Sequence, residues 1–274
     1  MTIEPHTIKK MVERHMPIGK ADYLSIQHVE RYRFAIENLT PPTRVLDIAS
    51  GGGYGTAMLL KHGCHTIGVD YDQEPLEVAQ ELWNFRCFIR GDALSLPFRN
   101  NSFESIVSFE TIEHVANGKG FLEEMHRILK RGGIFICSTP NIRYTFHPPA
   151  HVKEYAPKEF FNLVSETFPD AEHYGQYFEP IDRFRDLYMR KLLPAPLEII
   201  RKHLEPILIR LKLKMSLEKL LLASHLTALN PDTKVTARNW LNTIFYSQPA
   251  HRYEVKPFSG SQWLRIMIVV ARKL

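Results

Sequence analysis

Short apolar runs alternate with amphipathic stretches between residues 44 and 141, and this alternation predicts strands and helices in turn. The expected strands are residues 44–48, 65–69, 87–89, 105–109 and 134–138. The expected helices are a stretch that ends at residue 62, residues 74–84 and residues 121–129, and residues 130–133 should form a turn. Because the strands are continuous apolar runs between helices, we expect an α/β fold whose mostly parallel sheet is covered on both faces.

One amphipathic segment precedes this stretch. Residues 23–39 repeat apolar positions at steps of three and four, which predicts a helix that Pro41 and Pro42 bring to an end. We expect residues 1–42 to form an N-terminal helical cover.

The pattern after residue 140 is mostly helical. It predicts a loop rich in Pro and His at residues 139–153, a helix at 157–167 and a strand at 172–178. A long helical stretch at 181–250 and a final apolar strand at 263–272 follow. We therefore expect a core over 43–180, a helical insertion over 181–255 and a seventh, last core strand within 256–274.

The composition is that of an ordinary globular protein. The chain has 274 residues, of which 44% are hydrophobic and 24% charged, and this excludes a disordered or fibrous protein. The net charge of +5 equals the surplus of eight basic over three acidic residues between Arg190 and Lys219. Because the rest of the chain is neutral overall, DNA is not an expected partner.

The basic segment is also amphipathic. Residues 197–215 carry an apolar stripe at helical spacing, and most of the basic side chains lie off this stripe. Three interpretations stay open: a helical cover packed on the core, a dimer interface, or a surface helix over 197–219. Such a helix would contact anionic membrane or cover a lipid-linked or phosphorylated substrate.

The cysteine content and the hydropathy pattern indicate the cellular compartment in which the protein is expected. Cys64, Cys87 and Cys137 stand singly, without a C-x-x-C pair or a disulfide framework, so a reducing compartment is expected. The first residues lack the apolar run of a signal peptide, and no run of about 18 apolar residues could span a membrane. We expect a cytoplasmic protein, at most peripheral to the inner face of the membrane.

Ligand-binding residue types follow the first three strands of the predicted sheet. The first strand ends in a glycine cluster at 51–53, the second in Asp70, and the third in Gly91, Asp92 and Ala93. Ligands of open α/β sheets bind at these carboxyl ends, and an acid about 20 residues after the glycines suits ribose hydroxyls. A dinucleotide fingerprint would need a third glycine where Thr56 stands, which disfavours a nicotinamide oxidoreductase.

At this point the chain resembles the class I S-adenosylmethionine-dependent methyltransferases. The matching strings are VLDIASGGGYGT (45–56), GVDYDQE (68–74), RGDALSLPF (90–98), NSFESIVSFETIEHV (101–115) and LKRGGIFICSTPN (129–141). One departure is Ala49, where the family usually has glycine. The resemblance implies a Rossmann-like fold with a seven-stranded, mostly parallel sheet, and S-adenosylmethionine as cofactor.

The resemblance also assigns cofactor-binding residues. It places Asp47 in the cofactor site, Gly51 and Gly53 against the methionyl part, and Phe109 and Glu110 under the sulfonium. Asp70 would bind the ribose and Tyr71 would lie on the adenine face, while Asp92 and the Ala93 backbone would bind the adenine edge. The segment HVERYRFA (28–35) resembles a helix that covers the cofactor in bacterial members. Its Arg31 would approach the cofactor carboxylate, or would be an ordinary surface cation.

A second cluster of candidate residues follows the fourth strand. Glu110, Glu113 and His114 stand at i, i+3 and i+4, which on a helix is one face, and His151 returns from the loop after the fifth strand. Two carboxylates with imidazoles suit a divalent metal such as magnesium. The E-x-x-E-H spacing with a later His also resembles ubiquinone-biosynthesis O-methyltransferases and terminal ribose methyltransferases of small RNAs.

Three roles stay open for this second cluster. Its residues would hold a metal against a pair of hydroxyls, act without metal through Glu113, His114 or His151 as a base, or only brace the loop. We expect transfer of a methyl group to an oxygen of a small molecule or glycan. A sugar hydroxyl is the leading acceptor and a quinone-type or other phenol the alternative. RNA ribose methylation and a non-catalytic partner subunit rank lower.

Overall fold

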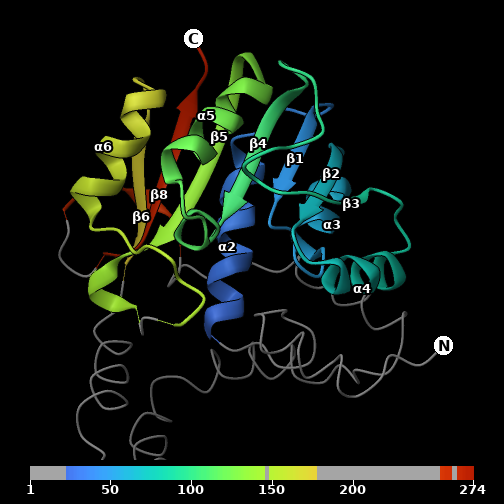
Figure 1. The fold of residues 1–274 in the computed structure, drawn as a ribbon, viewed down its shortest axis with the longest axis horizontal. Helices are drawn as coiled ribbons and strands as arrows, with labels where there is room; N and C mark the ends of the chain where they lie inside the picture. The colour runs from blue at the N-terminus through green and yellow to red at the C-terminus, as the bar shows by residue number, and fades with distance from the viewer. Residues whose placement is uncertain (1–22, 146–147, 178–253, 261–263) are drawn as a thin grey trace, which may run out of the picture.

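The structure is a computed structural model, which describes residues 23–145, 148–177, 254–260 and 264–274 (Figure 1). Nearly all of the predicted insertion over 181–255 lies outside these residues, as does the basic segment 197–219. Among the described residues, no helix combines the length and the apolar character needed to cross a membrane.

A single sheet forms the centre of the described part of the chain, with the strand order β3-β2-β1-β4-β5-β8-β6-β7. The strands are β1 (Arg44–Ile48), β2 (His65–Asp70), β3 (Phe88–Arg90), β4 (Phe103–Phe109), β5 (Leu129–Pro140), β6 (Glu172–Tyr177), β7 (Lys256–Pro257) and β8 (Leu264–Arg272). Pairs among β1 to β5 are parallel, whereas β8 runs antiparallel to both β5 and β6. It follows that β6 runs in the same direction as β5.

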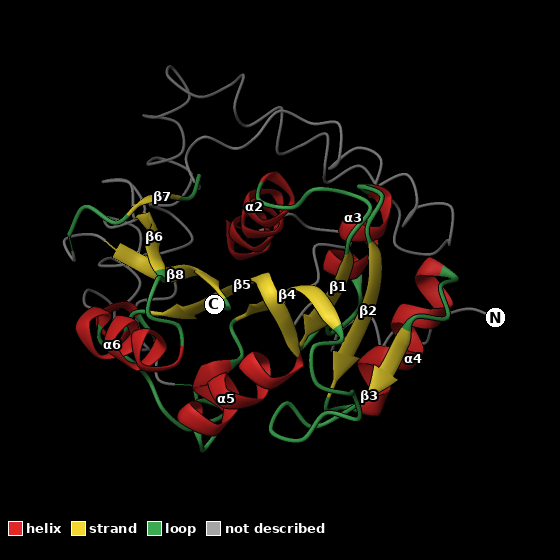
Figure 2. Ribbon diagram, turned by 90° about the horizontal axis from the view of Figure 1, so that it is seen from above, coloured by secondary structure: helices red, strands yellow, loops and turns green. Residues whose placement is uncertain are grey.

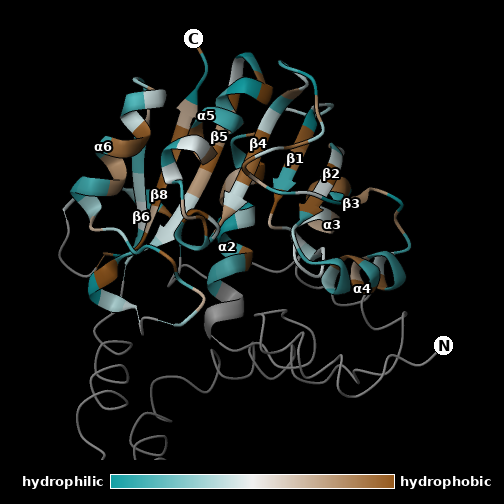
Figure 3. Cartoon of the chain, in the orientation of Figure 1, coloured by the Kyte–Doolittle hydropathy of each residue, from teal (hydrophilic) through white to brown (hydrophobic). Residues whose placement is uncertain are grey.

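Helices cover both faces of this sheet. They are α2 (Tyr23–Glu37), α3 (Tyr54–Lys61), α4 (Gln73–Trp83), α5 (Gly118–Ile128) and α6 (Pro157–Thr167), with short 3-10 turns η1 (Ile112–His114) and η2 (Ile142–Tyr144). Figure 2 shows α2 and α3 on one side and α5 and α6 on the other. Each face has its own apolar core, and α4 contributes to the core of α2 and α3. Figure 3 shows brown hydrophobic residues alternating with teal hydrophilic ones along α4, as expected of a covering helix.

The sequence predicted most of these elements, and three differences have simple causes. The sheet has eight strands instead of seven, because β7 is a two-residue edge strand that ends in Pro257 and has no periodicity to detect. The turn expected at 130–133 lies inside β5, where the register against β4 shifts. The helix expected to carry Glu110, Glu113 and His114 is only the three-residue turn η1.

Candidate active site

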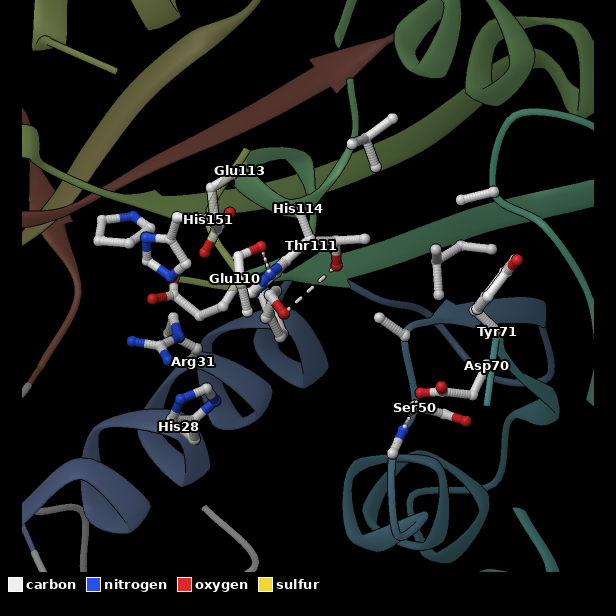
Figure 4. A pocket seen from close by; sticks show the side chains of 18 of the residues that line it. His28, Arg31, Ser50, Asp70, Tyr71, Glu110, Thr111, Glu113, His114 and His151 are labelled. Atoms are coloured by element: carbon white, nitrogen blue, oxygen red, sulfur yellow. Dashed lines mark hydrogen bonds between the residues drawn. The ribbon is translucent and has the colours of Figure 1, made fainter. Parts of the chain in front are cut away.

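A cavity of about 930 Å³ opens at the carboxyl edge of β1, β2 and β4. Of the predicted site residues, the cavity is lined by Arg31, Gly51, Asp70, Tyr71, Asp92, Ala93, Phe109, Glu110, Glu113, His114 and His151, but not by Asp47 or Gly53. Figure 4 shows two separate groups: Ser50, Asp70 and Tyr71 on one side, and Arg31, Glu110, Glu113 and His151 on the other. We call these the nucleotide end and the acceptor end.

The nucleotide end is organised around the Asp70 carboxylate. One oxygen of Asp70 accepts the Gly51 N–H at 2.8 Å, and the other accepts the Asp72 N–H at 3.0 Å. These two hydrogen bonds fix the carboxylate against the turn that follows β1. A carboxylate held in this way is an acceptor for hydroxyl groups, because each of its oxygens can accept more than one hydrogen bond.

The two predicted glycines of this end have different roles. Gly51 has φ +51°, and a Cβ built on it would have no atom within 4 Å, so its backbone borders open space. A Cβ on Gly53 would instead lie 2.5 Å from the Phe88 ring and 2.8 Å from Ala79. Gly53 therefore allows close packing of α3, and it is not among the residues that line the cavity.

Ala49 adopts the left-handed conformation, with φ 57°. This conformation disfavours residues that have a Cβ, which gives a physical reason for the glycine that the resembling family has at this position. The departure costs backbone strain, while the turn itself is kept.

Asp47, which the resemblance places in the cofactor site, lies behind the cavity and is not among the residues that line it. The carboxylate is fully buried and accepts hydrogen bonds from the Tyr32 hydroxyl (2.9 Å) and the Thr56 hydroxyl (2.6 Å). It thereby joins α2 and α3 to β1. Burial raises the pKa of Asp47 to about 7, although the two hydrogen bonds act in the opposite direction.

Arg31 is a buried residue, so its interpretation as a surface cation is wrong. It is 1% exposed, lines the cavity, and donates from Nη1 to the Gln176 side chain at 2.8 Å. Its Nε is buried without a hydrogen-bond partner, as is the Oγ of Ser50, another cavity residue. Buried polar atoms are rarely left unpaired, so both fit a cavity that holds a polar ligand.

The acceptor end departs from the helical face that the spacing suggested. Glu110 has φ 54°, and this left-handed residue turns the chain at the end of β4. Its carboxylate accepts the Ser138 hydroxyl at 2.9 Å. Glu113 is 1% exposed and accepts the Thr139 hydroxyl at 2.9 Å, whereas its second oxygen, Oε1, is buried without a partner.

A tethered loop brings His151 to this end. The backbone carbonyl of Glu113 accepts the N–H groups of both Val152 (2.8 Å) and Lys153 (3.0 Å). Immediately beyond, fully buried Tyr155 pairs with Asn141, at the end of β5. The loop after β5 is therefore held against the turn after β4, as expected for loops that follow neighbouring parallel strands.

The two imidazoles meet beside the Glu113 carboxylate. The ring centroids of His114 and His151 are 4.9 Å apart. One ligand atom from each of Glu113, His114 and His151 lies within 4.8 Å of the other two, and Glu110 is not part of this group. Nδ1 of His114 lies 2.9 Å from the Ala150 carbonyl oxygen, and Nδ1 of His151 lies 2.9 Å from Glu154 Oε1.

Electrostatics sets Glu113 apart from an ordinary surface carboxyl. Burial raises the pKa of Glu113 well above its usual value, and the nearby Glu110 charge adds to the rise. The Thr139 hydrogen bond and the Arg31 charge oppose this rise without cancelling it. A buried carboxyl of this kind, with an unpaired oxygen beside two imidazoles, is suited to share a proton or to hold a cation.

Sequence reasoning missed Ser50, Gln176 and Glu154. Ser50 stands beside the glycine cluster, and the glycines at 51–53 gave the stronger sequence signal for a binding turn. Gln176 lies near the end of a predicted strand, but only the fold brings it to Arg31, 145 residues away in sequence. Glu154 stands three residues after His151, a spacing that could have been noticed.

Comparisons with known proteins agree with the fold. A family model described as a methyltransferase domain matches residues 46–137. A probable S-adenosylmethionine-dependent methyltransferase of Mycolicibacterium smegmatis is 32% identical, over 47% of this chain and 52% of that protein. A crystal structure of an Archaeoglobus fulgidus S-adenosylmethionine-dependent methyltransferase superposes with a TM-score of 0.56 at 15% identity, over 98% of this chain and all of the other.

A demethylmenaquinone methyltransferase of Clavibacter sepedonicus is 33% identical, over 54% of this chain and 70% of that protein. The chain spans 52–61% of the length of the mycobacterial relatives that it matches. The shared region contains the turns after β1 and β2 and the strands on which the nucleotide end is built. The chain therefore belongs to the class I S-adenosylmethionine-dependent methyltransferase family.

Proposed function

We propose that this protein transfers the methyl group of S-adenosylmethionine to a hydroxyl oxygen, with a sugar hydroxyl as the leading acceptor. The observation that carries the proposal is the layout of the cavity. It joins a nucleotide end built on Asp70 to an acceptor end where Glu113, His114 and His151 converge. The same cavity can thus hold a methyl donor and a hydroxyl that must lose a proton.

The residues of the nucleotide end fit the cofactor. Asp70 would accept the ribose hydroxyls, Tyr71 would lie on the adenine, and Asp92 with the Ala93 backbone would read the adenine edge. The unpaired Nε of Arg31 and Oγ of Ser50 supply two further polar partners for a bound ligand. When bound, S-adenosylmethionine supplies a methyl group that its sulfonium already activates, so alignment of the acceptor contributes much of the catalysis.

The acceptor end would remove the proton of the hydroxyl. With Nδ1 of each imidazole beside an oxygen, Nε2 is the ring nitrogen left to take a proton. Because burial raises the pKa of the Glu113 carboxyl, its ionised form would readily take that proton over from the imidazolium. Thr139 holds this carboxyl in place through its hydrogen bond.

The same donor set fits a divalent ion. Two imidazoles and one carboxylate with an unpaired oxygen are the ligand types of zinc, iron or manganese sites, and they suit magnesium less well, because magnesium prefers oxygen ligands. An ion held there would lower the pKa of the acceptor hydroxyl.

A second acceptor class, quinone-type or other phenols, is favoured by a different observation. A relative with 33% identity is a demethylmenaquinone methyltransferase, a name that gives a quinone-type substrate but does not argue for transfer to oxygen. The sugar acceptor is favoured by the hydrogen-bonding side chains of His28, Tyr144 and Thr145 on the wall of the cavity.

The test is a methyl-transfer assay with purified protein, labelled S-adenosylmethionine and two panels of acceptors, methyl glycosides and catechols. We expect an O-methylated product from one panel, preferentially from glycosides. Each assay is repeated with chelator and after readdition of manganese, so that loss and recovery of activity report a metal. Binding of S-adenosylhomocysteine without transfer to either panel, or to RNA, would indicate a cofactor-binding partner subunit instead.

A further inference from the structure

We propose that Glu154 is a positioning residue that sets the tautomer of His151. By accepting the Nδ1 proton, it leaves Nε2 as the nitrogen that bears a lone pair at the acceptor end. The role of that lone pair rests on the proposed function, whereas the tautomer itself can be measured without any methyl acceptor.

The contact between the two side chains is short and sheltered. His151 Nδ1 lies 2.9 Å from Glu154 Oε1, and the side chains are only 12% and 7% exposed. An ion pair at the surface would be weakened by solvent and mobility, but this pair is largely removed from water.

The loop that carries the pair is held on both sides. Val152 and Lys153, between the two residues, donate their N–H groups to the Glu113 carbonyl. Tyr155, directly after Glu154, is fully buried, and its carbonyl accepts the Ile142 N–H at 3.0 Å. The spacing of His151 and Glu154 is thus fixed by the backbone, so the contact does not depend on two free side chains finding each other.

Hydrogen-bonding chemistry then decides the tautomer. An ionised carboxylate can only accept, so the imidazole nitrogen beside it must carry the proton, and in the neutral ring the other nitrogen is then unprotonated. His114 obeys the same logic, because its Nδ1 lies 2.9 Å from the Ala150 carbonyl oxygen, which also only accepts. In their neutral forms, both rings would therefore present an unprotonated Nε2.

This shared choice has a chemical consequence beside Glu113. Two lone pairs can receive an acceptor proton or a cation, whereas a ring in the Nε2–H form would offer an N–H that excludes both. Groups that orient an imidazole through its other nitrogen commonly contribute 10–100-fold to activity or metal affinity. Of the two orienting groups, the Ala150 carbonyl belongs to the backbone, so only Glu154 can be removed by substitution.

The experiment is heteronuclear NMR of the imidazole nitrogens in the full-length protein with S-adenosylhomocysteine, at a pH where the rings are neutral. Glu154→Met keeps the side-chain bulk without a carboxylate, Glu154→Gln restores an oxygen acceptor, and Glu159→Gln is the matched control. Glu159 is 47% exposed and pairs with Lys153 in the same segment.

We expect Nδ1–H tautomers for both rings in the wild type and in the Glu159→Gln control. In Glu154→Met, His151 should move toward the Nε2–H form while His114 stays unchanged, and Glu154→Gln should return His151 toward Nδ1–H. A wild-type His151 protonated on Nε2, or a tautomer that Glu154→Met leaves unchanged, would overturn the proposal.

Activity supplies a second readout for the acceptor that the two panels identify. Glu154→Met should lower kcat about 10–100-fold with the KM for S-adenosylmethionine unchanged, and Glu154→Gln should recover part of the loss. A merely structural role would instead weaken cofactor binding and stability together. If the NMR result is as expected but the wild type transfers no methyl group, the proposed function fails and the tautomer assignment stands.

Discussion

The two ends of the cavity are built in different ways. At the nucleotide end, Asp70 is held by the backbone N–H groups of Gly51 and Asp72, on turns that directly follow strands. At the acceptor end, Glu113, His114 and His151 come from two loops, and Thr139, Ala150 and Glu154 orient their side chains. The first end depends on local backbone conformation, and the second on side-chain contacts between segments.

This contrast explains how one fold can keep its cofactor while changing its acceptor. A turn fixed by the strand before it tolerates few substitutions, because glycine conformations and backbone donors must be kept. Side chains on tethered loops can be exchanged singly without disturbing the sheet. The two ends should therefore respond independently to substitution.

The largest effect is expected at the acceptor end. His151→Ala removes a base or ligand and should lower turnover about 10²–10⁴-fold, while the affinity for S-adenosylhomocysteine stays as in the wild type. Steady-state kinetics and calorimetry measure the two quantities. The control is His65→Ala, at the exposed amino end of β2. A parallel loss of cofactor affinity in His151→Ala would show that the ends are not independent.

At the nucleotide end, Asp70→Ala should weaken S-adenosylhomocysteine binding by about 2–4 kcal/mol, since hydrogen bonds to a charged group contribute about 1.5–3 kcal/mol each and water recovers part. Titration calorimetry measures the change. Glu77→Ala, exposed on α4 and outside the cavity, should leave the affinity near that of the wild type. Unchanged affinity in Asp70→Ala would contradict the assignment of this end.

The two glycines after β1 should affect different properties: substitution of Gly53 should mainly lower stability, and substitution of Gly51 should mainly weaken cofactor binding. Gly53→Ala should cost about 2–4 kcal/mol of unfolding free energy, because the methyl group would collide with Phe88 and the residue is left-handed. Gly51→Ala, with open space around its Cβ, should cost only about 1–2 kcal/mol of backbone strain but should impair cofactor binding. Urea unfolding and calorimetry on both variants distinguish the two roles, and the reverse pattern would refute them.

The last effect is a pH dependence behind the nucleotide end, which is small for each pH unit. The pKa of Asp47 is raised from 3.8 to about 7, so over this range the folded protein holds a proton that the unfolded chain has lost. The free energy of unfolding should therefore fall as the pH rises toward 7, by at most about 1.4 kcal/mol per pH unit from this group.

Asp47→Asn removes this titration while keeping an oxygen that can accept a hydrogen bond. Urea unfolding of both proteins at pH 5 and pH 8 should show a smaller decrease in stability for the variant than for the wild type. Equal decreases would mean that Asp47 keeps an ordinary pKa in the folded protein.

Local patterns in the sequence predicted most of the fold. Apolar runs marked β1 to β5, because strands covered on both faces leave no polar alternation. The site was predictable where it depends on topology: loops after neighbouring parallel strands share an edge, which brought His151 to His114. The turn at Glu110 was not predictable, since a spacing of i, i+3 and i+4 does not reveal one left-handed residue.

What the sequence could not predict are contacts across long separations. The sequence pattern of the glycine cluster does not distinguish Gly53, which packs on Phe88, from Gly51, which borders the cavity. Burial of Arg31 depends on Gln176 and on how α2 lies over the sheet. Such facts depend on which element packs against which, and one sequence contains no direct signal of that.

The antiparallel placement of β8 between β5 and β6 has a consequence for how this protein could be re-engineered. Since β6 runs in the same direction as β5, its end at Tyr177 lies at the edge where the cavity opens, and Glu254 lies just before β7, the strand that pairs with β6. The carboxyl end of β6 and the residues just before β7 therefore both lie at the acceptor edge, so substitutions at these two places could reshape that edge without interrupting a described strand of the core.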